Sequence, residues 1–540
     1  MTAGGGPSLD SVRGTSATTG TGLGAKPGAS PDAKPTAKAG EAPDAHAGGA
    51  PGVQPPAPAA PPRTAPRAED RERHRASVVA HFDRHAARQD GRRAKGYGEL
   101  LAHYHRYFVP RGARVLEVGC GTGDLLAALE PSDGLGVDCS PEMIRRARER
   151  HPAPGLHFMA AFIEDVDLQG ATFDCIILSD VVGTSFDILQ LLRSLRRFCH
   201  ARTHVLFNLH SRLWQPALRV AQALGRHDPF PELAWVTRED LVNLLVLAGF
   251  EATATDSRIL WPARAPLLAP FLNRVLAPFA PFRWLCLTNW VVGRLPAPLP
   301  ATAGVSVICA CRNEAGNIPV LVERFPDFGS AAELIFVEGG SSDDTQGACR
   351  RAIADHPGMD ISLLAQTGRG KGDAVRTGFA AARHEILVIL DADMTVRPED
   401  LPAFVDTLRS GKAEFVNGSR LVYPMEGRAM RFLNVLGNRF FSLTFTWLLG
   451  QPVKDTLCGT KVLLRSDYEK LAARRAYFGE FDPFGDFDLL FGASRLGLRI
   501  LDLPVRYRDR TYGTTNISRF RHGLILMRMS LLALLKLKMR

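Results

Sequence analysis

Two long stretches of this chain alternate short, strongly apolar runs with amphipathic ones, and this alternation constrains the fold more than any other feature. In the first stretch the apolar run Arg114–Val118 is followed by a helical pattern over Asp124–Leu129, and the series continues to His204–Leu209. In the second, Val305–Ala310 is followed by a helical pattern over Ile318–Phe325, and the alternation repeats. Strands that alternate with helices predict a parallel, doubly wound sheet. Two such series predict two α/β domains in tandem, which suits a chain of 540 residues.

The composition changes along the chain, and these changes predict the domain boundaries. Residues 1–68 are almost entirely Ala, Gly, Pro, Thr and Ser with isolated charges, so they bury too little apolar surface to fold and we expect a disordered tail. Residues 256–302 are rich in Pro and apolar side chains, which predicts a linker that packs on a domain or a membrane surface. The expected order is a tail (1–68), a first domain (69–255), a linker (256–302), a second domain (303–509) and a basic amphipathic segment (510–540).

The charge and the cysteine content narrow the class of protein. The formal net charge of +10 favours anionic partners such as phosphates, nucleotides, nucleic acid or an acidic membrane surface. The nine cysteines are scattered without a C-x-x-C pair, so neither a zinc ribbon nor a disulfide framework is indicated, and a reducing compartment fits best. The N-terminus lacks the basic start and apolar stretch of a signal peptide, so we expect a cytoplasmic location.

The first alternating series contains a glycine-rich loop in a specific setting. The segment Glu117-Val-Gly-Cys-Gly-Thr-Gly123 follows a predicted strand and opens a helix, where glycines let the backbone approach a ligand closely. Asp138 ends the next strand, where a carboxylate can hold both ribose hydroxyl groups. A glycine-rich loop alone is a weak signal, but here strand, loop, helix, strand and acid occur in order, and the leading Glu117 argues against a plain dinucleotide fold.

This arrangement resembles the class I S-adenosylmethionine-dependent methyltransferases over about residues 95–255. The resemblance implies a Rossmann-like sheet, with Asp138 on the ribose. Phe162 stands where the family often has an acid near the adenine, and its ring can stack on that base instead. The cofactor-binding residues that it implies are Glu117, Gly119, Gly121, Gly123, Asp138, Phe162 and Ser179. Asp180 and His210 end later strands in the expected acceptor region, and an ordinary strand-end role is the alternative for both.

The second series carries two carboxylates at the end of its most apolar strand. In Leu387-Val-Ile-Leu-Asp-Ala-Asp393, residues 391 and 393 are expected to project to the same side of the strand. Two like charges so close are unfavourable unless a cation lies between them or one carries a proton. Carboxylate oxygens select Mg²⁺ or Mn²⁺, which also takes phosphate oxygens as ligands and neutralises a leaving nucleoside diphosphate. Asp391 and Asp393 therefore predict a metal site, and a solvated pair in a loop is the alternative.

Three other segments of this series suit a nucleotide donor. Arg312-Asn-Glu-Ala-Gly-Asn-Ile318 follows a strand that ends in small residues, and Glu338-Gly-Gly-Ser-Ser-Asp-Asp-Thr345 follows the next strand. Gly370-Lys-Gly-Asp-Ala-Val-Arg376 opens a helix, and its Lys371, Arg376 and free amide groups suit a diphosphate.

With further motifs, residues 303–520 resemble the family 2 glycosyltransferases, most of all the branch that contains dolichyl-phosphate mannose synthase and related polyprenyl-phosphate sugar transferases. Those motifs are Asn417-Gly-Ser-Arg420, Asp455-Thr-Leu-Cys-Gly-Thr-Lys461 and Arg510-Thr-Tyr-Gly-Thr-Thr-Asn516. The resemblance implies a GT-A-like sheet that binds a nucleotide sugar, with the metal on Asp391 and Asp393. The donor-binding residues that it implies are Asn313, Glu314, Glu338, Lys371, Arg376 and Asp391, and the phosphate or acceptor contacts are Arg420, Lys461 and Arg510.

The acceptor decides whether sugar transfer needs a base. A phosphate monoester is largely ionised near neutral pH and needs only cationic positioning, whereas a hydroxyl acceptor needs a carboxylate within hydrogen-bond reach. The candidate catalytic residues are Asp455, which the resemblance places beside the acceptor, and Asp486 and Asp488. Helix capping is the alternative for the last two.

The basic C-terminal segment predicts a membrane contact. No acidic residue follows Asp509, and basic side chains flank the apolar run Gly523–Leu535. A helix over that run spans about 20 Å, short of the roughly 30 Å hydrocarbon core, so we expect it to lie in the interface of an anionic membrane. Phe432–Leu449 is a second amphipathic candidate, and core packing is the alternative for both.

The sequence thus predicts a metal-dependent glycosyltransferase that moves a sugar from a nucleotide-sugar donor to a membrane-associated, polyprenyl-phosphate-like acceptor. Its first module is expected to use S-adenosylmethionine to methylate the same product or a related sugar or lipid. We expect peripheral association with the cytoplasmic face of the membrane and no nucleic-acid partner, because aromatic residues are sparse among the basic ones. The alternatives are a glycosyltransferase for a cell-envelope polysaccharide or another soluble acceptor, and a first module that binds cofactor or docks without catalysis.

Overall fold

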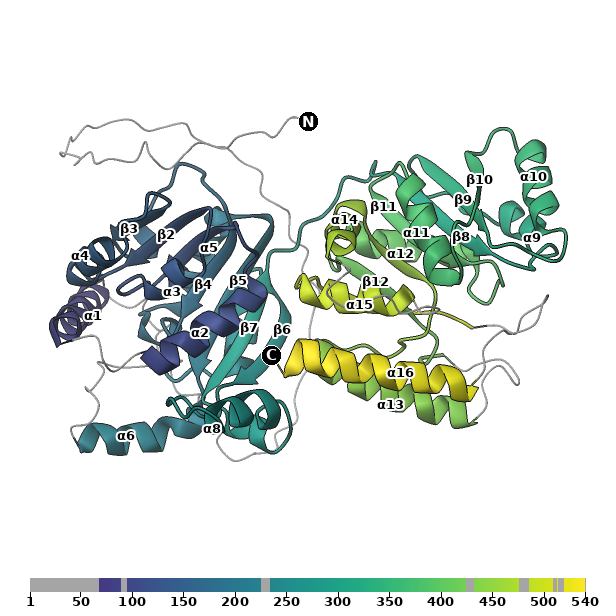
Figure 1. Ribbon diagram of the computed structural model, residues 1–540. Helices are drawn as coiled ribbons and strands as arrows, with labels where there is room; N and C mark the ends of the chain where they lie inside the picture. Colours follow the sequence, from purple (N-terminus) through teal and green to yellow (C-terminus); the bar gives the residue numbers. More distant parts are fainter. Residues whose placement is uncertain are drawn as a thin grey trace, which may run out of the picture. The chain divides into compact units, whose positions relative to one another are not determined.

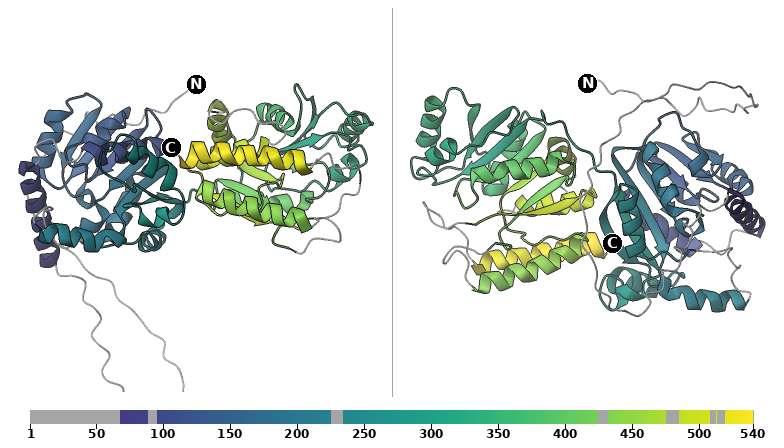
Figure 2. Two further views of the ribbon diagram at one scale, coloured as in Figure 1. Left: turned by 60° about the horizontal axis from the view of Figure 1, so that its bottom comes forward. Right: turned by 180° about the vertical axis from the view of Figure 1, so that it is seen from behind.

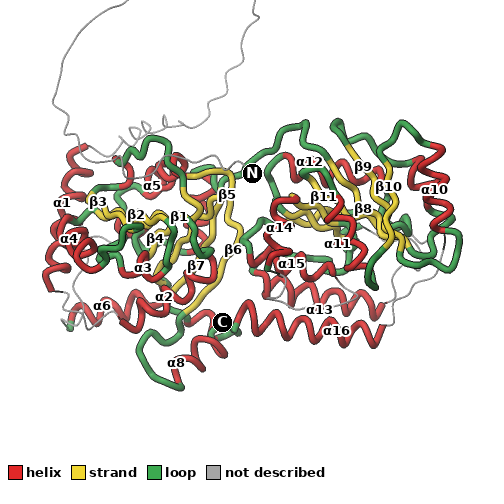
Figure 3. The backbone as a smooth tube through the Cα atoms, turned by 45° about the horizontal axis from the view of Figure 1, so that its top comes forward, coloured by secondary structure: helices red, strands yellow, loops and turns green. Residues whose placement is uncertain are grey.

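The computed structural model describes residues 68–88, 95–224, 234–423, 432–474, 485–507, 512 and 519–539. Within them the chain forms two α/β domains in tandem, each built on a seven-stranded sheet (Figure 1). The strands of each sheet lie among helices (Figure 3). The predicted tail, residues 1–68, falls almost wholly outside the described residues.

The strands of the first domain are β1 (Arg114–Val118), β2 (Asp133–Asp138), β3 (Leu156–Ala160), β4 (Phe173–Ser179), β5 (Cys199–His210), β6 (Glu251–Arg258) and β7 (Thr288–Arg294). Its helices are α1 (Ala68–Arg88), α2 (Lys95–Phe108), α3 (Asp124–Ala128), α4 (Pro141–Arg150), α5 (Ile188–Leu195), α6 (Gln215–Ala223), α7 (Arg238–Leu247) and the short α8 (Leu268–Pro270). The sheet order is β3-β2-β1-β4-β5-β7-β6. All neighbouring pairs from β3 to β5 are parallel, and β7 runs antiparallel to both β5 and β6.

The strands of the second domain are β8 (Val305–Cys311), β9 (Ala332–Glu338), β10 (Ile361–Ala365), β11 (Ile386–Asp391), β12 (Phe415–Ser419), β13 (Lys461–Leu464) and β14 (Ile500–Pro504). Its helices are α9 (Ile318–Glu323), α10 (Thr345–Asp355), α11 (Lys371–Ala381), α12 (Leu401–Arg409), α13 (Phe432–Leu449), α14 (Arg465–Ala473), α15 (Gly485–Arg495) and α16 (Arg519–Ala533), which ends in the π-helical turn Leu534–Lys538. The order is β10-β9-β8-β11-β13-β12-β14, with β13 antiparallel to both of its neighbours.

Local sequence signals explain where individual helices begin. Ser140 caps α4 by accepting a hydrogen bond from the Met143 amide at 3.1 Å, and Pro141 stands at the first helical position. Thr237 and Asp240 form a reciprocal capping box at the start of α7. The helical patterns predicted over Asp124–Leu129 and Ile318–Phe325 begin at the first residues of α3 and α9.

The central strand of the second domain is buried on both faces, which explains its continuous apolar run. Val388 and Leu390 pack in one hydrophobic cluster and Leu387 and Ile389 in another. Strands of a sheet covered on both faces lose the alternation of apolar and polar residues for this reason.

Two predictions about the architecture were wrong in detail. The sheets are mixed and not purely parallel, because β7 and β13 run against their neighbours. Residues 256–302 are also not simply a linker, since β6 runs on to Arg258 and β7 lies between β5 and β6. The Pro-rich composition obscured a strand in which Trp290 is 2% exposed. That indole packs against Tyr104, His105 and Phe108 of α2.

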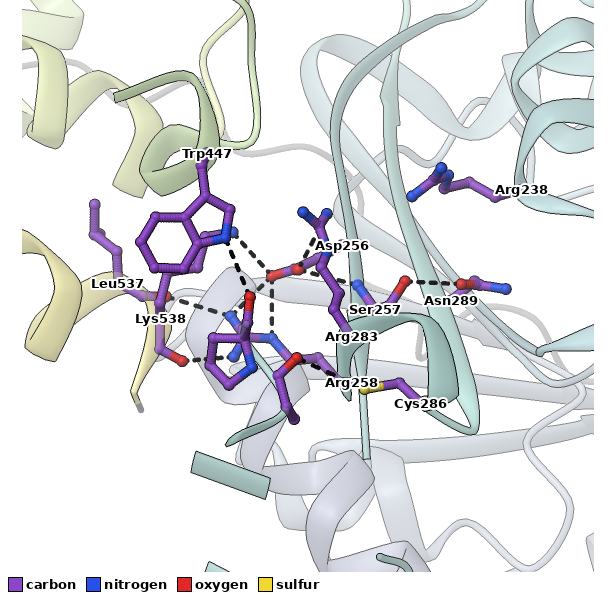
Figure 4. Close-up of polar contacts among 12 residues, drawn as sticks. Arg238, Asp256, Ser257, Arg258, Arg283, Cys286, Asn289, Trp447, Leu537 and Lys538 are labelled. Carbon is purple, nitrogen blue, oxygen red and sulfur yellow. Dashed lines mark hydrogen bonds and ion pairs between the residues drawn. The ribbon is translucent and has the colours of Figure 1, made fainter. Parts of the chain in front are cut away.

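A buried arginine on β6 contacts the C-terminal end of the described chain. The Arg258 guanidinium donates to the carbonyl oxygens of Lys538 at 2.6 Å and Leu537 at 3.4 Å, and to the Asp256 carboxylate at 3.0 Å (Figure 4). Lys538 Nζ lies 3.3 Å from the same Asp256 carboxylate. The last carbonyl groups of a helix have no partner within the helix, and here a side-chain cation satisfies them.

The helices α13 and α16 lie side by side in the second domain (Figures 1 and 2). One face of α16 is buried through Leu526, Met529 and Ala533, so the core-packing alternative is correct for that face. No helix in the described part of the chain combines the length and the apolar character needed to cross a bilayer.

The position of Trp290 generates a stability prediction with a matched control. Replacing Trp290 by Ala should lower the free energy of unfolding by about 3–5 kcal/mol, because the indole is buried. The Trp284→Ala change, also between residues 256 and 302, removes an indole that is 71% exposed and should alter stability by no more than about 0.5 kcal/mol. Urea unfolding followed by circular dichroism measures both, and equally small effects would contradict the assignment of β7 to the folded core.

Candidate functional site

The carboxyl ends of three neighbouring strands meet at one edge of the second sheet. Asp391 of β11 is paired in register with Ala310 of β8, and Cys311 of β8 is paired with Glu338 of β9. The chain order reverses between β8 and β11, and ligands of open α/β sheets bind at such a switch point. The register thus brings Asp391 and Glu338, predicted from separate motifs, to the same edge.

Asp391 is surrounded by cationic side chains. Lys371 Nζ, at the first residue of α11, lies 2.5 Å from Asp391 Oδ1. Burial by itself would raise the pKa of Asp391, but the charges of Lys371, Lys461 and Arg420 outweigh it and lower that pKa. The carboxylate is therefore an anion available to a metal ion, and Lys371 is placed to exchange it for a phosphate group.

Asp393 lies in the turn beyond β11, so strand alternation is not what orients it. Its Oδ1 accepts hydrogen bonds from the Thr395 amide at 3.1 Å and the Thr395 hydroxyl at 2.6 Å, and the residue is 7% exposed. No group of three or more His, Cys, Asp or Glu that could hold a metal occurs among the described residues. The two carboxylates fit an ion that takes most of its ligands from phosphate and water, as Mg²⁺ and Mn²⁺ do.

The backbone at Gly459 packs closely against the Asp391 carboxylate. A Cβ atom built at this position would collide with both the Asp391 carboxylate and the Lys371 ammonium group. Gly459 belongs to the motif Asp455-Thr-Leu-Cys-Gly-Thr-Lys461. The sequence did not predict its role, because only the folded chain shows that its backbone approaches Asp391 so closely.

The other predicted donor residues lie in loops at the same edge. Asn313, with a φ of 58°, accepts a hydrogen bond from the Ser342 amide at 2.8 Å. The Glu338 carboxylate accepts from the Ser341 amide at 2.6 Å. Glu314 accepts from the Asn317 amide group at 2.6 Å, and its own backbone amide donates to the Thr345 hydroxyl at 2.8 Å. These side chains hold the β8 and β9 loops together.

Arg376, the remaining predicted donor residue, lies one turn into α11. It is 3.5 Å from the Asp373 carboxylate, which also accepts a hydrogen bond from the Gly368 amide at 2.7 Å. The loop that opens α11 is thereby held in place next to Lys371.

Arg420 and Asp455, predicted for phosphate and acceptor contacts, are paired with each other. Arg420 Nε and Nη2 donate to the two carboxylate oxygens at 2.7 and 2.8 Å, and the Asp455 side chain is fully buried. Burial would raise the pKa of Asp455, but the Arg420 charge and hydrogen bonds lower it, so Asp455 is a poor proton acceptor. The geometry favours a positioning role for Asp455 over the predicted catalytic one.

The remaining predicted residues of this domain are either buried to different degrees or lie outside the described residues. Lys461 of β13 is fully buried, and its ammonium group donates a hydrogen bond to the Cys458 carbonyl oxygen. Its positive charge also lowers the pKa of Asp391. Asp488 is half-buried on α15, whereas the side chain of Asp486 and the whole of Arg510 lie outside the described residues. The phosphate contact of Arg510 and the base roles of Asp486 and Asp488 stay predictions.

The glycine-rich loop of the first domain has the backbone expected of a ligand site. Gly119, Gly121 and Gly123 all have positive φ, and a Cβ atom at Gly119 would strike the Val181 side chain, so only glycine fits there. The Gly121 amide donates to the Asp138 carboxylate at 2.9 Å. Asp138 thus holds the loop at the end of β2, where the resemblance places the ribose.

Glu117 is a buried acid beneath this loop. The residue is 2% exposed, and Oε2 has no hydrogen-bond partner within the described part of the chain. Burial raises the pKa of Glu117 to about 8, despite a lowering hydrogen bond from a backbone amide. An orphaned buried carboxyl oxygen fits a cationic ligand such as the sulfonium and ammonium groups of S-adenosylmethionine.

Phe162 and Ser179 lie at the same edge but differ in surroundings. The Arg75 guanidinium lies 4.3 Å from the centroid of the Phe162 ring, so one ring face already has a cationic neighbour. Ser179 is the last residue of β4 and is paired with Asn208 of β5. Tyr97 of α2, which no sequence pattern singled out, donates to Asp180 at 2.8 Å.

Comparison with known families matches one family profile to each of the two domains. Residues 89–255 match the methyltransferase domain profile, and residues 306–472 match that of glycosyl transferase family 2. The chain joins a methyltransferase domain to a family 2 glycosyltransferase domain. The methyltransferase match ends at residue 255, although the first sheet continues to β7.

Similar proteins of known name match the glycosyltransferase domain. Glycosyltransferase AglJ of Haloferax volcanii is 28% identical over 227 residues, which are 42% of this chain and 70% of that protein. Polyprenol monophosphomannose synthase of Mycolicibacterium smegmatis is 26% identical over 42% of this chain and 85% of its own. The dolichyl-phosphate hexose transferase of Haloferax volcanii is 28% identical over 41% of this chain and 89% of its own.

Solved structures resemble each domain separately. Glucosyl-3-phosphoglycerate synthase from Mycobacterium tuberculosis has a TM-score of 0.33 and 22% identity over 44% of this chain and 81% of that chain. An S-adenosylmethionine-dependent methyltransferase from Mesorhizobium loti has a TM-score of 0.29 and 21% identity over 37% of this chain and 100% of that chain.

Gly459 gives a direct test of the glycosyltransferase site. Gly459→Ala should weaken metal-dependent binding of UDP or GDP by about tenfold or more, since a loss of about 1.4 kcal/mol suffices and the new methyl group displaces Asp391 and Lys371. Gly358→Ala, where an added Cβ atom meets nothing within 4 Å, is the control. Calorimetric titration with Mn²⁺ present measures both, and unchanged binding by the Gly459 variant would show that Asp391 does not hold the donor.

Proposed function

We propose that the glycosyltransferase domain moves a sugar from a nucleotide-sugar donor to a polyprenyl-phosphate acceptor at a membrane surface. The observation that carries this proposal is the cluster at the end of β11, where Asp391 is kept ionised by the adjacent Lys371 and by the charge of the buried Lys461. A divalent cation on Asp391 and Asp393 would supply Lewis-acid stabilisation to the leaving diphosphate.

The residues around the metal site have complementary roles in this reaction. Lys371, at the start of α11, would pair with a donor phosphate oxygen if a divalent cation took its place beside Asp391. The Arg420–Asp455 pair keeps a fixed cation close enough to lower the pKa of Asp391. With a phosphate acceptor no proton has to be removed, so the reaction is consistent with an Asp455 carboxylate that already accepts four hydrogen bonds.

Two observations support a lipid-linked acceptor over a soluble one. Relatives that match this domain are named for transfer to polyprenol and dolichyl phosphates. The solvent-facing side of α16 is also apolar: Leu524, Met527, Leu531 and Leu535 are 51–65% exposed and follow one helical face. Neighbouring α13 exposes Phe440 and Leu443 as well. Soluble proteins rarely leave such faces uncovered, and an amphipathic helix in a membrane interface buries them.

The first domain is proposed to bind S-adenosylmethionine and to transfer its methyl group, which the cofactor supplies as an electrophile. Gly119 and Gly121 offer a backbone that a ligand can approach closely. Asp138 stands ready for the ribose hydroxyl groups, and the unpartnered Glu117 oxygen faces the cationic end. A positive ligand would offset the burial of Glu117 and restore its ionised form.

Asp393→Ala tests the metal-dependent chemistry. Transfer of labelled sugar into the organic phase of a membrane extract should fall by about a hundredfold or more, because several kcal/mol of metal stabilisation are lost. Binding of S-adenosylmethionine by the same variant should stay unchanged. Asp406→Ala, at a carboxylate 72% exposed on α12, should leave transfer intact. Wild-type label that never enters the organic phase would refute the lipid acceptor, and full activity of the Asp393 variant would refute the metal site.

The exposed face of α16 can be tested by vesicle flotation. The double change Leu524→Ser and Leu531→Ser should lower partitioning onto anionic vesicles by about tenfold or more, because each buried leucine contributes about 1.5–3 kcal/mol. The control is Val246→Ser with Leu247→Ser on α7, where the side chains are 62% and 56% exposed. Equal losses in both variants would mean general surface stickiness, and no loss in either would refute the contact through α16.

A further inference from the structure

Three polar side chains converge at the carboxyl edge of the methyltransferase sheet. Tyr97 comes from α2, Asp180 follows β4 and His210 ends β5. Tyr97 Oη donates to Asp180 Oδ2 at 2.8 Å, and His210 Nδ1 lies 3.1 Å from Asp180 Oδ1. The centroids of the Tyr97 and His210 rings are 5.8 Å apart. One carboxylate thus organises a phenol and an imidazole from separate elements.

The backbone at Asp180 is unusual for a residue with only a structural role. Its φ is 54°, in the left-handed region that an aspartate adopts at a cost, and its amide donates to the Asn208 carbonyl at 3.0 Å. Strained residues of this kind gather at functional sites, where the surrounding structure holds them. An incidental strand-end aspartate needs no such conformation.

This cluster adjoins the glycine-rich loop. Val181, the residue after Asp180, is so close to Gly119 that a Cβ atom there would strike its side chain. In the sheet, Glu117 is paired with Ile177, and Ser179 is paired with Asn208. Since alternate residues share a face, Glu117, Asn208 and His210 project to the same side. His210 therefore shares the face of the acid beneath the proposed cofactor site.

A second buried group on this face points to an absent ligand or water. Asn208 is fully buried, and neither its amide nitrogen nor its amide oxygen has a partner among the residues that the structure describes. Buried side-chain amides are nearly always satisfied. An unmet donor and acceptor two residues before His210 indicate that something polar binds there.

Electrostatics single out His210 as the proton acceptor of the three. Burial opposes the charged imidazolium, but the Asp180 charge and hydrogen bond outweigh it and raise the pKa of His210. Burial and Asp180 both raise the pKa of Tyr97, so the phenol stays protonated. The nearby His105 of α2 is neutral, because burial lowers its pKa to about 4. Of these histidines and the phenol, the His210 imidazole is therefore the group suited to accept a proton.

We propose that His210 is the general base of the methyltransferase domain and that the acceptor is a hydroxyl group. The Asp180 carboxylate, 3.1 Å from Nδ1, favours the tautomer with its proton on Nδ1, and this leaves the Nε2 lone pair to accept the proton. The hydroxyl oxygen forms a bond to the methyl carbon, the carbon–sulfur bond breaks with its electron pair going to sulfur, and the hydroxyl proton passes to Nε2. The products are a methyl ether, a neutral thioether and an imidazolium that Asp180 stabilises. This inference rests on the proposed methyl transfer.

The surroundings favour a hydroxyl over an acceptor that is already anionic. A carboxylate or phosphate acceptor has no proton to lose and would be repelled by Asp180 and Glu117. A hydroxyl group is a weak nucleophile until its proton is taken, so it gains from a positioned base.

The experiment uses the full chain and compares two histidines of the same strand. His210→Gln should slow methyl transfer by about 10²–10⁴-fold, with S-adenosylmethionine affinity changed less than about threefold. His200→Gln is the matched control: His200 also pairs with an aspartate, Asp174, at 3.2 Å, and its side chain is 34% exposed against 36% for His210. Its rate should equal that of the wild type. A parallel loss of rate and cofactor affinity at His210 would mean a structural role and overturn the proposal.

Two further readouts separate the base from the acceptor class. Histidine-selective NMR should show His210 with a pKa above the ordinary value, and Asp180→Asn should lower it; an unshifted resonance would overturn the dyad. Lipid and polysaccharide extracts incubated with methyl-labelled cofactor identify the product. The expected product is a methyl ether, whose label resists mild alkali and is not retained by a cation exchanger. Label that mild alkali releases would indicate a methyl ester, and label that the exchanger retains would indicate a methylated amine. Either result would overturn the hydroxyl acceptor. Cofactor binding without label in either extract would refute methyl transfer itself, independently of sugar transfer.

Discussion

Parallel pairing of the central strands is the constraint on which both sites depend. In each domain it carries the ends of neighbouring strands to one edge, where loops diverge and polar side chains can gather without breaking the core. In the second domain this pairing brings Asp391 and Glu338 to one edge. In the first, Val118 is paired with Val137 and with Leu178, so the glycine loop, Asp138 and Asp180 all follow paired residues. Chemistry placed there does not disturb the packing beneath it.

The parallel parts of both sheets could be predicted from the sequence, and the antiparallel parts could not. Strands such as β8 and β11 are buried on both faces and read as continuous apolar runs. The antiparallel β13 begins with a buried lysine, Lys461, and its neighbour β12 includes the buried Asn417. Residues that are satisfied only by tertiary partners look like loop residues in a sequence. The strand β7 was missed for another reason, because it lies within a Pro-rich stretch.

Some residues of the candidate sites could likewise be predicted from the sequence, and others could not. Strand-end acids and glycine loops follow from local order, which is why Asp391, Asp138 and Gly119 could be placed in advance. The pairing of Arg420 with Asp455 joins residues 35 positions apart, and no spacing rule predicts that each would satisfy the other. The role of Tyr97 could not be predicted for a related reason, since its hydrogen-bond partner Asp180 lies 83 residues away.

Each of the two sheet edges carries an acidic residue, but the surroundings of the two acids shift their pKa values in opposite directions. Asp391 is a carboxylate among Lys371, Lys461 and Arg420, and these charges keep it ionised despite burial. Glu117 is a carboxyl group with no such partners, and burial raises its pKa to about 8. A cation bound near Glu117 would supply the missing charge, whereas the cations around Asp391 are already in place for anionic phosphates. The local charge around each acid therefore suits the ligand proposed for it, a cationic cofactor in the first domain and a metal–diphosphate in the second.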